Sequence, residues 1–152
     1  MEKAAVDTVR LDAWRSFLTA HAGLIDRLGE EMEAETGLPL PWYEVLLLIY
    51  ESDDRQLRMH ELAESRLLSR SAMTRFVDRM EAAGLVHRET CISDRRGTFV
   101  TATDLGKKRF REAGRVHLRG IEEHFARRVA EPEAATLTTM MDRVVVGLAD
   151  QP

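Results

Sequence analysis

The chain has 152 residues, of which 44% are hydrophobic and 32% are charged, and its formal net charge is −4. This length fits one compact domain, or a small binding module joined to a dimerisation element, and the composition excludes wholesale disorder. No apolar run approaches the roughly 20 residues of a membrane span, and the first residues lack the apolar segment of a signal peptide. With Cys91 as the single cysteine, we expect no disulfide framework and a place in the reducing cytoplasm, away from membranes.

The charges are distributed unevenly along the chain. Between Arg55 and Arg119 there are 15 Lys or Arg against 8 Asp or Glu, whereas the remaining residues have 7 against 18. Attraction to phosphate depends on the local field within a Debye length of about 8–10 Å, not on the total charge. The basic middle of the chain is therefore compatible with a surface for DNA, despite the negative total.

The first half of the chain predicts two helices. Apolar residues recur at three- and four-residue steps from Leu11 to Met32, which predicts a long amphipathic helix ending near Gly37. Its length exceeds what a small DNA-reading module could bury alone. The segment Trp42–Tyr50 predicts a short, strongly apolar helix, and Ser52–Asp54 predicts a loop.

A helix, a short turn and a second helix are predicted next. The first helix covers Met59–Glu64, and the second covers Ser69–Met80, where Ser69 can cap its N-terminus and Gly84 fits its C-terminal stop. The 3.6-residue period divides the second helix into an apolar and a polar face. The apolar face carries Met73, Phe76, Val77 and Met80.

Two strands and two helices complete the prediction. Strands are expected at Leu85–Thr90 and Thr98–Ala102, around a polar turn. Thr103 can cap the helix that follows, and Pro132 suits the first turn of a last helix. We therefore expect a mainly α fold with a small β-hairpin wing: a winged helix-turn-helix lobe over residues 40–103, with an N-terminal helix in 1–36 and C-terminal helices in 104–152.

The polar face of the second helix has the residue types that contact duplex DNA. An arginine can present two donors to guanine, and serine or threonine hydroxyls can bond to bases or phosphates. A solvated helix face is the alternative, and the arginines that follow at the hairpin tip argue against it. The candidate DNA contacts on this helix are Ser69, Arg70, Ser71, Thr74, Arg75 and Arg79.

The hairpin adds a second group of candidates. Arg95 and Arg96 lie at its tip, and a narrow A·T minor groove attracts a guanidinium group. Arg88 on the preceding strand could reach a phosphate or pair with Asp94. An ordinary Asp-Arg turn without DNA contact is the alternative for the tip.

These segments resemble the MarR family of bacterial winged-helix transcription regulators, and the resemblance covers nearly the whole chain. Its most specific part is Asp94-Arg95-Arg96-Gly97, followed by Val100, Thr103 and Gly106. Ala102 departs from the pattern, because the family usually has a leucine there. The other residues that carry the resemblance are Leu62-Ala63, Leu67-Leu68-Ser69-Arg70-Ser71, Thr74-Arg75, Val77–Val86 and Arg88.

The resemblance implies a homodimer in which the N- and C-terminal helices of two subunits interlock. Two winged lobes would then bind adjacent half-sites of a pseudo-palindrome, with Arg95 in the minor groove and Asp94 bracing arginine side chains. Many members of the family release DNA when a small phenolic or aromatic molecule enters the cleft between the dimer helices and the DNA lobe. We therefore expect a ligand-responsive regulator that acts as a repressor.

Four side chains near the junction of the first two helices are candidates for such a ligand site. Trp14, His21, Trp42 and Tyr43 offer apolar surface with a few polar anchors, as small-molecule pockets usually do. Packing in the core and in the dimer is the alternative for all four.

Sensing of oxidants or zinc stays open as an alternative within the family. Cys91 has arginines nearby that could activate its thiol, although oxidant-sensing members carry their cysteine in the N-terminal helix. His21, His117 and His124 would have to converge with a carboxylate to bind zinc, and packed or solvent-facing histidines are the favoured interpretation. We therefore predict neither metal nor cofactor.

The sequence does not predict an enzyme. It has no phosphate-binding glycine loop, no nucleophile elbow and no His-Glu-x-x-His motif. A winged-helix module used only for protein assembly, without DNA, remains a further alternative, and the arginine-rich helix argues against it.

Overall fold

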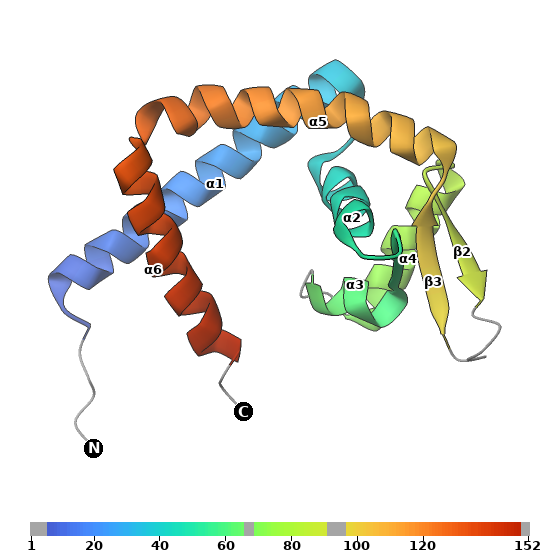
Figure 1. The fold of residues 1–152 in the computed structure, drawn as a ribbon, viewed down its shortest axis with the longest axis horizontal. Helices are drawn as coiled ribbons and strands as arrows, with labels where there is room; N and C mark the ends of the chain where they lie inside the picture. Colours follow the sequence, from blue (N-terminus) through green and yellow to red (C-terminus); the bar gives the residue numbers. More distant parts are fainter. Residues whose placement is uncertain (1–5, 66–68, 91–96, 150–152) are drawn as a thin grey trace. The chain divides into compact units, whose positions relative to one another are not determined.

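The computed structural model describes residues 6–65, 69–90 and 97–149, and Figure 1 shows how their helices and strands follow one another. The helices are α1 (Thr8–Thr36), α2 (Leu40–Glu51), α3 (Met59–Ser65), α4 (Arg70–Ala82), α5 (Asp104–His124) and α6 (Glu131–Ala149), with a 3-10 turn at Ala126–Arg128. The strands are β1 (Gln56–Arg58), β2 (Val86–Thr90) and β3 (Thr98–Ala102). The mainly α fold with a small β wing is thus confirmed.

The chain divides into two compact units. One is Ile25–His117, here called the winged unit, and the other consists of the residues up to Leu24 and from Leu118 on, here called the terminal unit. The winged unit contains α2, α3, α4 and the whole sheet, together with the adjoining parts of α1 and α5. None of the described helices is long and apolar enough to cross a membrane.

Local side-chain chemistry sets the ends of the helices, largely where the sequence predicts them. Gly37 follows α1 with φ 66°, and Gly84 follows α4 with φ 73°. Both angles lie in the left-handed region that glycine adopts without steric cost. At the start of α4 the Ser69 hydroxyl accepts a hydrogen bond of 3.2 Å from the amide of Ala72. At the start of α5 the Thr103 hydroxyl accepts one of 2.9 Å from the amide of Gly106.

The sheet has three antiparallel strands in the order β1-β3-β2, not the two of the predicted hairpin. The third strand, β1, follows the predicted loop, from which it is separated by Arg55, and it pairs Leu57 with Val100 at its centre. On the other side of β3, Arg88 of β2 is the partner of Val100. The sequence did not predict β1, because three residues are too few to show the alternation that identifies a strand.

The hydrophobic core lies in the winged unit. The predicted apolar face of α4 is confirmed: Met73, Val77 and Met80 are completely buried, and Phe76 is half-buried. The other fully buried large side chains come from α1, α2, α3, the sheet and the turn between α1 and α2, and they include Met32, Leu38, Leu46, Ile49, Leu62, Val86 and Val100. The start of α5 is close to the start of β2, since a Cβ atom on Gly106 would lie 2.0 Å from the Leu85 carbonyl oxygen. This close approach requires glycine.

The terminal unit contrasts with this core. No residue of α6 is buried, and the two buried residues of α1, Leu28 and Met32, both belong to the winged unit. Within the terminal unit, Trp14 and Phe17 of α1 line one groove together with Met140 and Val144 of α6. Although apolar, Trp14 and Val144 remain 56% and 54% exposed.

Candidate nucleic-acid interface

The polar face of α4 is exposed to solvent, as a helix that reads DNA requires. Ser71, Thr74, Arg75 and Arg79 are all exposed, opposite the buried face of the same helix. Arg75 forms no ion pair with any residue that the structure describes. The guanidinium carbon of Arg79 lies 5.7 Å from the centre of the Phe76 ring. Because the opposite face is anchored in the core, these side chains project from a rigid support.

Two further candidates lie at the N-terminus of α4. Ser69 is exposed, but its hydroxyl caps the helix and lies 3.2 Å from the hydroxyl of Ser71. Its first role is therefore to hold the N-terminus of α4, where free backbone amides and the helix dipole favour a phosphate. Arg70 is the first residue of α4, and its side chain lies outside the described part of the structure.

The wing candidates are only partly visible. Asp94, Arg95 and Arg96 lie outside the described residues, as does Cys91. Arg88 is described, and its guanidinium group is bound to carboxylates of α4: one nitrogen donates to Glu81 over 2.5 Å and the other to Asp78 over 2.7 Å. Its donors are thus engaged within the winged unit.

The four candidates for the ligand site are divided equally between the two units. Trp14 and His21 belong to the terminal unit, where both rings lie 6.0 Å from that of Phe17, centre to centre. Trp42 and Tyr43 belong to the winged unit. Trp42 is half-buried and lines a shallow groove with Leu38 and Arg109, whereas Tyr43 is buried in the core.

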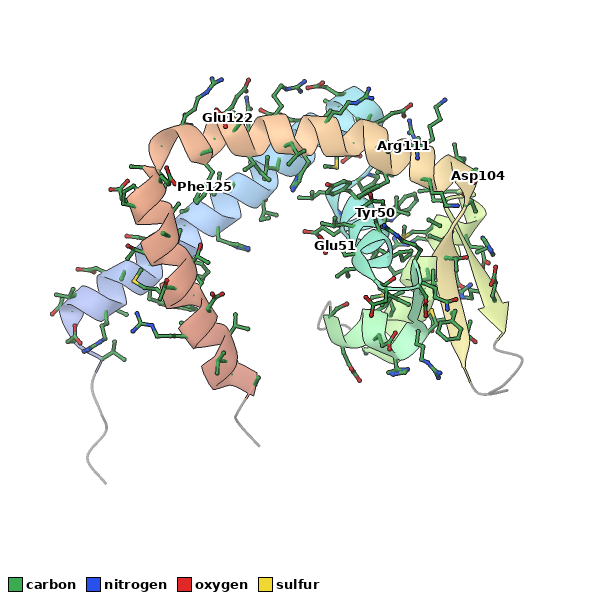
Figure 2. All side chains as sticks on the ribbon, viewed as in Figure 1. Tyr50, Glu51, Asp104, Arg111, Glu122 and Phe125 are labelled. Carbon is green, nitrogen blue, oxygen red and sulfur yellow. The ribbon has the colours of Figure 1, made fainter. Side chains whose placement is uncertain are left out.

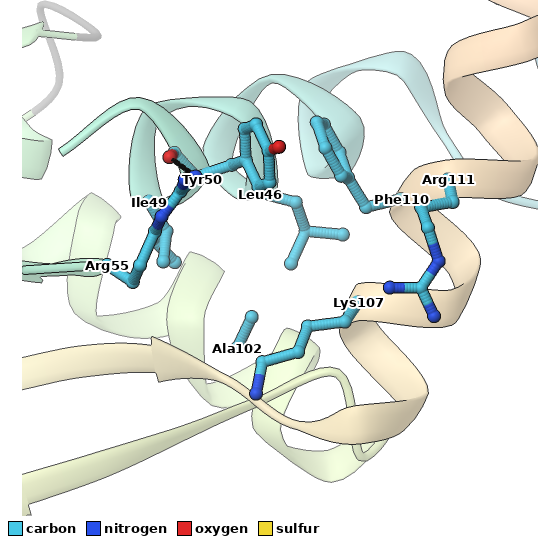
Figure 3. Close-up of a pocket in the computed structure, with 8 residues that line it drawn as sticks. All are labelled: Leu46, Ile49, Tyr50, Arg55, Ala102, Lys107, Phe110 and Arg111. Carbon is cyan, nitrogen blue, oxygen red and sulfur yellow. Dashed lines mark hydrogen bonds between the residues drawn. The ribbon is translucent and has the colours of Figure 1, made fainter.

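The winged unit has a different cavity, of about 470 Å³, between α2, the start of α5 and the sheet. Figure 3 shows apolar walls with cationic groups at their edges, and Figure 2 shows Tyr50 and Arg111 in the part of the winged unit where α2 and α5 approach each other. The apolar lining comes from Leu46, Ile49, Tyr50, Ala102 and Phe110, and the cations are Arg55, Lys107 and Arg111.

Arg55 is held in this cavity in an unusual way. Its φ of 56° is left-handed, which is uncommon for a residue other than glycine. Its guanidinium carbon lies 3.9 Å from the centre of the Tyr50 ring, and its side chain donates a hydrogen bond to the Tyr50 carbonyl oxygen. Backbone strain of this kind costs on the order of 1–3 kcal/mol and often occurs at ligand sites.

Sequence reasoning missed this cavity. It assigned no role to Arg55, Lys107 or Arg111. The sequence does contain a signal for this cavity. Phe110 and Arg111 follow Lys107 by three and four residues, which puts two cations and one aromatic ring on one side of α5.

A row of aromatic rings continues from the cavity into the core. The Phe110 ring stacks on Tyr43 at 5.3 Å and lies tilted against Tyr50 at 5.0 Å, and Tyr43 contacts the ring of His117 at 4.9 Å. Burial lowers the pKa of His117, and the carboxylate of Glu44 opposes this shift. Burial likewise raises the pKa of the Tyr43 hydroxyl, with a contribution from Glu51. Within the described residues, no group of three His, Cys, Asp or Glu side chains could hold a metal ion.

A capped helix with an exposed polar face, supported by a core and flanked by a three-stranded wing, defines a winged helix-turn-helix protein of the DNA-binding class. A sequence model of the MarR family matches residues 36–97, which include α2, α3, α4 and β2. The solved structures described next are similar to the chain over almost its full length. This chain belongs to the MarR family of transcription regulators.

Two of the similar structures are MarR family regulators from Streptomyces coelicolor. AbsC is 30% identical, with a TM-score of 0.89 over 98% of this chain and 100% of its own. Sco3205, solved in complex with DNA, is 32% identical, with a TM-score of 0.87 over 97% of this chain and 95% of its own. A curated relative, the HTH-type transcriptional regulator YdgJ of Bacillus subtilis, is 30% identical over 104 residues, which are 68% of this chain and 62% of that protein.

Proposed function

We propose that this protein is a cytoplasmic, homodimeric repressor that binds a pseudo-palindromic stretch of double-stranded DNA and releases it when a small aromatic ligand binds. The exposed polar face of α4 carries this proposal, because Arg75 and Arg79 project from a helix whose other face is fixed in the core. The similar regulator Sco3205 was solved with DNA. That complex supports a duplex as the partner over a protein-assembly role.

In this mechanism α4 enters the major groove. Arg75 offers the paired donors that suit guanine O6 and N7, while Ser71 and Thr74 can bond to bases or phosphates. The N-terminal turn of α4, capped by Ser69, is suited to a phosphate. Arg95 and Arg96 would extend the contact into the minor groove next to it.

A second copy of this chain is the proposed partner of the terminal unit. Val144, Val145 and Leu148 of α6 are 54%, 64% and 65% exposed, and Phe17 of α1 is 41% exposed. An apolar surface of this kind marks a site of association. Two copies related by a twofold axis would present two α4 helices to half-sites with the same symmetry.

The cavity beside Tyr50 supports the ligand response. Its aromatic and aliphatic walls suit a flat apolar body, and Arg55, Lys107 and Arg111 suit a carboxylate on that body. Arg55 directly precedes β1, whose residues pair with β3 of the wing. A ligand that draws Arg55 away from Tyr50 would therefore act on the wing, and it would favour a form that binds DNA less well.

Selection from a random pool of duplex DNA tests the proposed function. We expect enrichment of a sequence with two symmetry-related half-sites, and a steep fall in its affinity as salt is added. Arg95→Ala is expected to leave the dimer intact and to weaken binding to the selected duplex in an anisotropy titration. If no sequence were enriched, DNA recognition would be contradicted.

The ligand response has its own test. Benzoate-type carboxylates are expected to bind and to release DNA, whereas the matching neutral amides are not. Arg111→Gln should weaken carboxylate binding in calorimetry without changing DNA affinity in the absence of ligand. Equal binding of acid and amide would show that the cavity does not select for a negative charge.

A further inference from the structure

Arg88 of β2 connects the wing to the helix that carries the DNA-reading face. Its guanidinium nitrogens donate to Glu81 at 2.5 Å, to Asp78 at 2.7 Å and to the Thr74 carbonyl oxygen at 3.1 Å. Its backbone amide donates to the other carboxylate oxygen of Glu81 at 3.0 Å. Four hydrogen bonds thus link one residue of β2 to α4, which lies beside it (Figure 1).

The three acceptors follow one line along the helix. Thr74, Asp78 and Glu81 are spaced by four and three residues, so they lie on one stripe of α4. Arg75 and Arg79 are each one residue further along, which puts them on the adjacent side of the same two turns. A bond network along such a stripe adds to the buried contacts of Met73, Val77 and Met80 in setting the rotation of the helix about its own axis. This rotation decides where the two arginines point.

The charges of this network oppose a direct role in phosphate binding. Asp78 and Glu81 together bring two negative charges against the single positive charge of Arg88, and the Asp78 side chain is 54% exposed beside the reading face. An extra carboxylate near DNA repels phosphate and weakens binding. The Arg88 side chain is itself only 22% exposed.

We propose that Arg88 is a positioning residue of the DNA interface: it locks the rotation of α4 against the wing, with Asp78 and Glu81 as its acceptors. This inference rests on the proposed DNA-binding function. It differs from the two roles expected from the sequence, a phosphate contact or a pair with Asp94. A planar arginine fork suits the task, because it can donate to two carboxylates from one fixed geometry.

Asp78→Asn gives the sharpest test, since the two possible roles of Asp78 predict opposite changes in DNA affinity. If Asp78 only contributes negative charge near DNA, its removal strengthens binding. If Asp78 holds Arg88, its removal weakens binding to the selected operator, by about 3-fold to 10-fold. Glu89→Gln is the matched control. It removes an exposed carboxylate of β2, the strand that carries Arg88, and the described partner of this carboxylate is His87. This variant should not weaken binding.

Arg88→Lys and Arg88→Gln separate positioning from phosphate contact. A phosphate contact would tolerate lysine. Its loss from both subunits of the proposed dimer in Arg88→Gln would reduce the slope of log affinity against log salt by about 1.8, that is, about 0.9 for each contact. If Arg88 is a positioning residue, both variants weaken operator binding, and the slope of log affinity against log salt stays unchanged. The ratio of operator affinity to affinity for an unrelated duplex should also fall, because misdirected arginines still meet phosphates.

Measuring Tm and the fraction of active protein for each variant distinguishes a loss of folding from a loss of positioning. Partial unfolding lowers operator and unrelated-duplex affinity equally and leaves their ratio unchanged, which would overturn the inference. Tighter binding by Asp78→Asn, or near-normal binding by Arg88→Lys, would overturn it as well. If the unsubstituted protein bound no duplex at all, the proposed function itself would fail.

Discussion

The two units of this protein differ in what they do with their apolar side chains. The described residues that form the buried hydrophobic core all lie in the winged unit, between Leu28 and Val116. The terminal unit also has apolar residues on α6, yet Val144, Val145 and Leu148 remain more than half exposed. The same hydrophobic pattern thus forms a core in one unit and a surface in the other.

The difference shows that periodicity identifies an apolar face but not what covers it. Each helix of the winged unit has the sheet or other helices to pack on, whereas the described terminal unit offers α6 only the start of α1 and the end of α5. A chain segment that remains so apolar in isolation suits association with another subunit. Our first two predictions separate the units by the kind of damage a substitution causes.

Met73→Ala in the winged unit should have the largest effect on folding. Met73 is fully buried on α4, and removing most of a buried methionine side chain costs about 2–5 kcal/mol through lost burial and the cavity that remains. Urea denaturation should show this as a lower free energy of unfolding. The control Glu64→Ala, at an exposed site of α3, should change it by less than about 0.5 kcal/mol. Equal losses in both variants would contradict a core located in this unit.

Val145→Glu in the terminal unit should disturb association of the subunits and leave the folding of each subunit nearly unchanged. Val145 is 64% exposed, so the substitution has little to disturb within one subunit, but it places a charge in the proposed dimer interface. Light scattering should show a monomer, and operator affinity should fall by about 100-fold or more, because the two half-sites are no longer bound together. Thr139→Glu, exposed on another side of α6, is the control and should leave the dimer intact. A dimeric Val145→Glu would require a different interface.

Arg75→Ala tests the surface that the core supports. Arg75 is exposed and should lose only its contacts with DNA, so operator affinity is expected to fall by about 10-fold to 100-fold while Tm stays unchanged. Arg115→Ala, an exposed arginine of α5 in the same unit, removes the same charge elsewhere and should have a much smaller effect. Similar losses for both would mean that only the total charge matters.

Local chemistry explains which parts of this fold could be predicted. Glycine at 37 and 84, and the hydroxyls of Ser69 and Thr103, act within a few residues of where they stand, and the structure uses them as helix ends. The buried side of α4 could likewise be predicted, because it follows from the helical period alone.

Features that depend on distant partners could not be predicted in the same way. Strand β1 exists through its pairing with β3, more than 40 residues later. The cavity brings Arg55 together with Lys107 and Arg111 across a similar separation. From the sequence, Asp94 of the wing was the expected carboxylate partner of Arg88. The described contacts of Arg88 are instead with Asp78 and Glu81 on the preceding helix.

The smallest expected effect concerns His117, the last residue of the winged unit. Its ring packs on Tyr43, its Nδ1 atom is buried without a hydrogen-bond partner among the described residues, and burial lowers its pKa below the ordinary 6.5. Below about pH 6.5 the unfolded chain therefore takes up a proton that the folded protein still excludes. The free energy of unfolding should consequently decrease as the pH falls through this range.

His117→Phe removes that proton site and keeps an aromatic ring against Tyr43. We expect the Tm of this variant, relative to the unsubstituted protein, to be higher at pH 5 than at pH 8, since only the unsubstituted protein loses stability by protonation of residue 117. Thermal melts at both pH values give the comparison. An equal difference at the two values would mean that the imidazole is as easily protonated in the folded protein as in the unfolded chain, and that the edge of the winged unit is more open to water than its packing indicates.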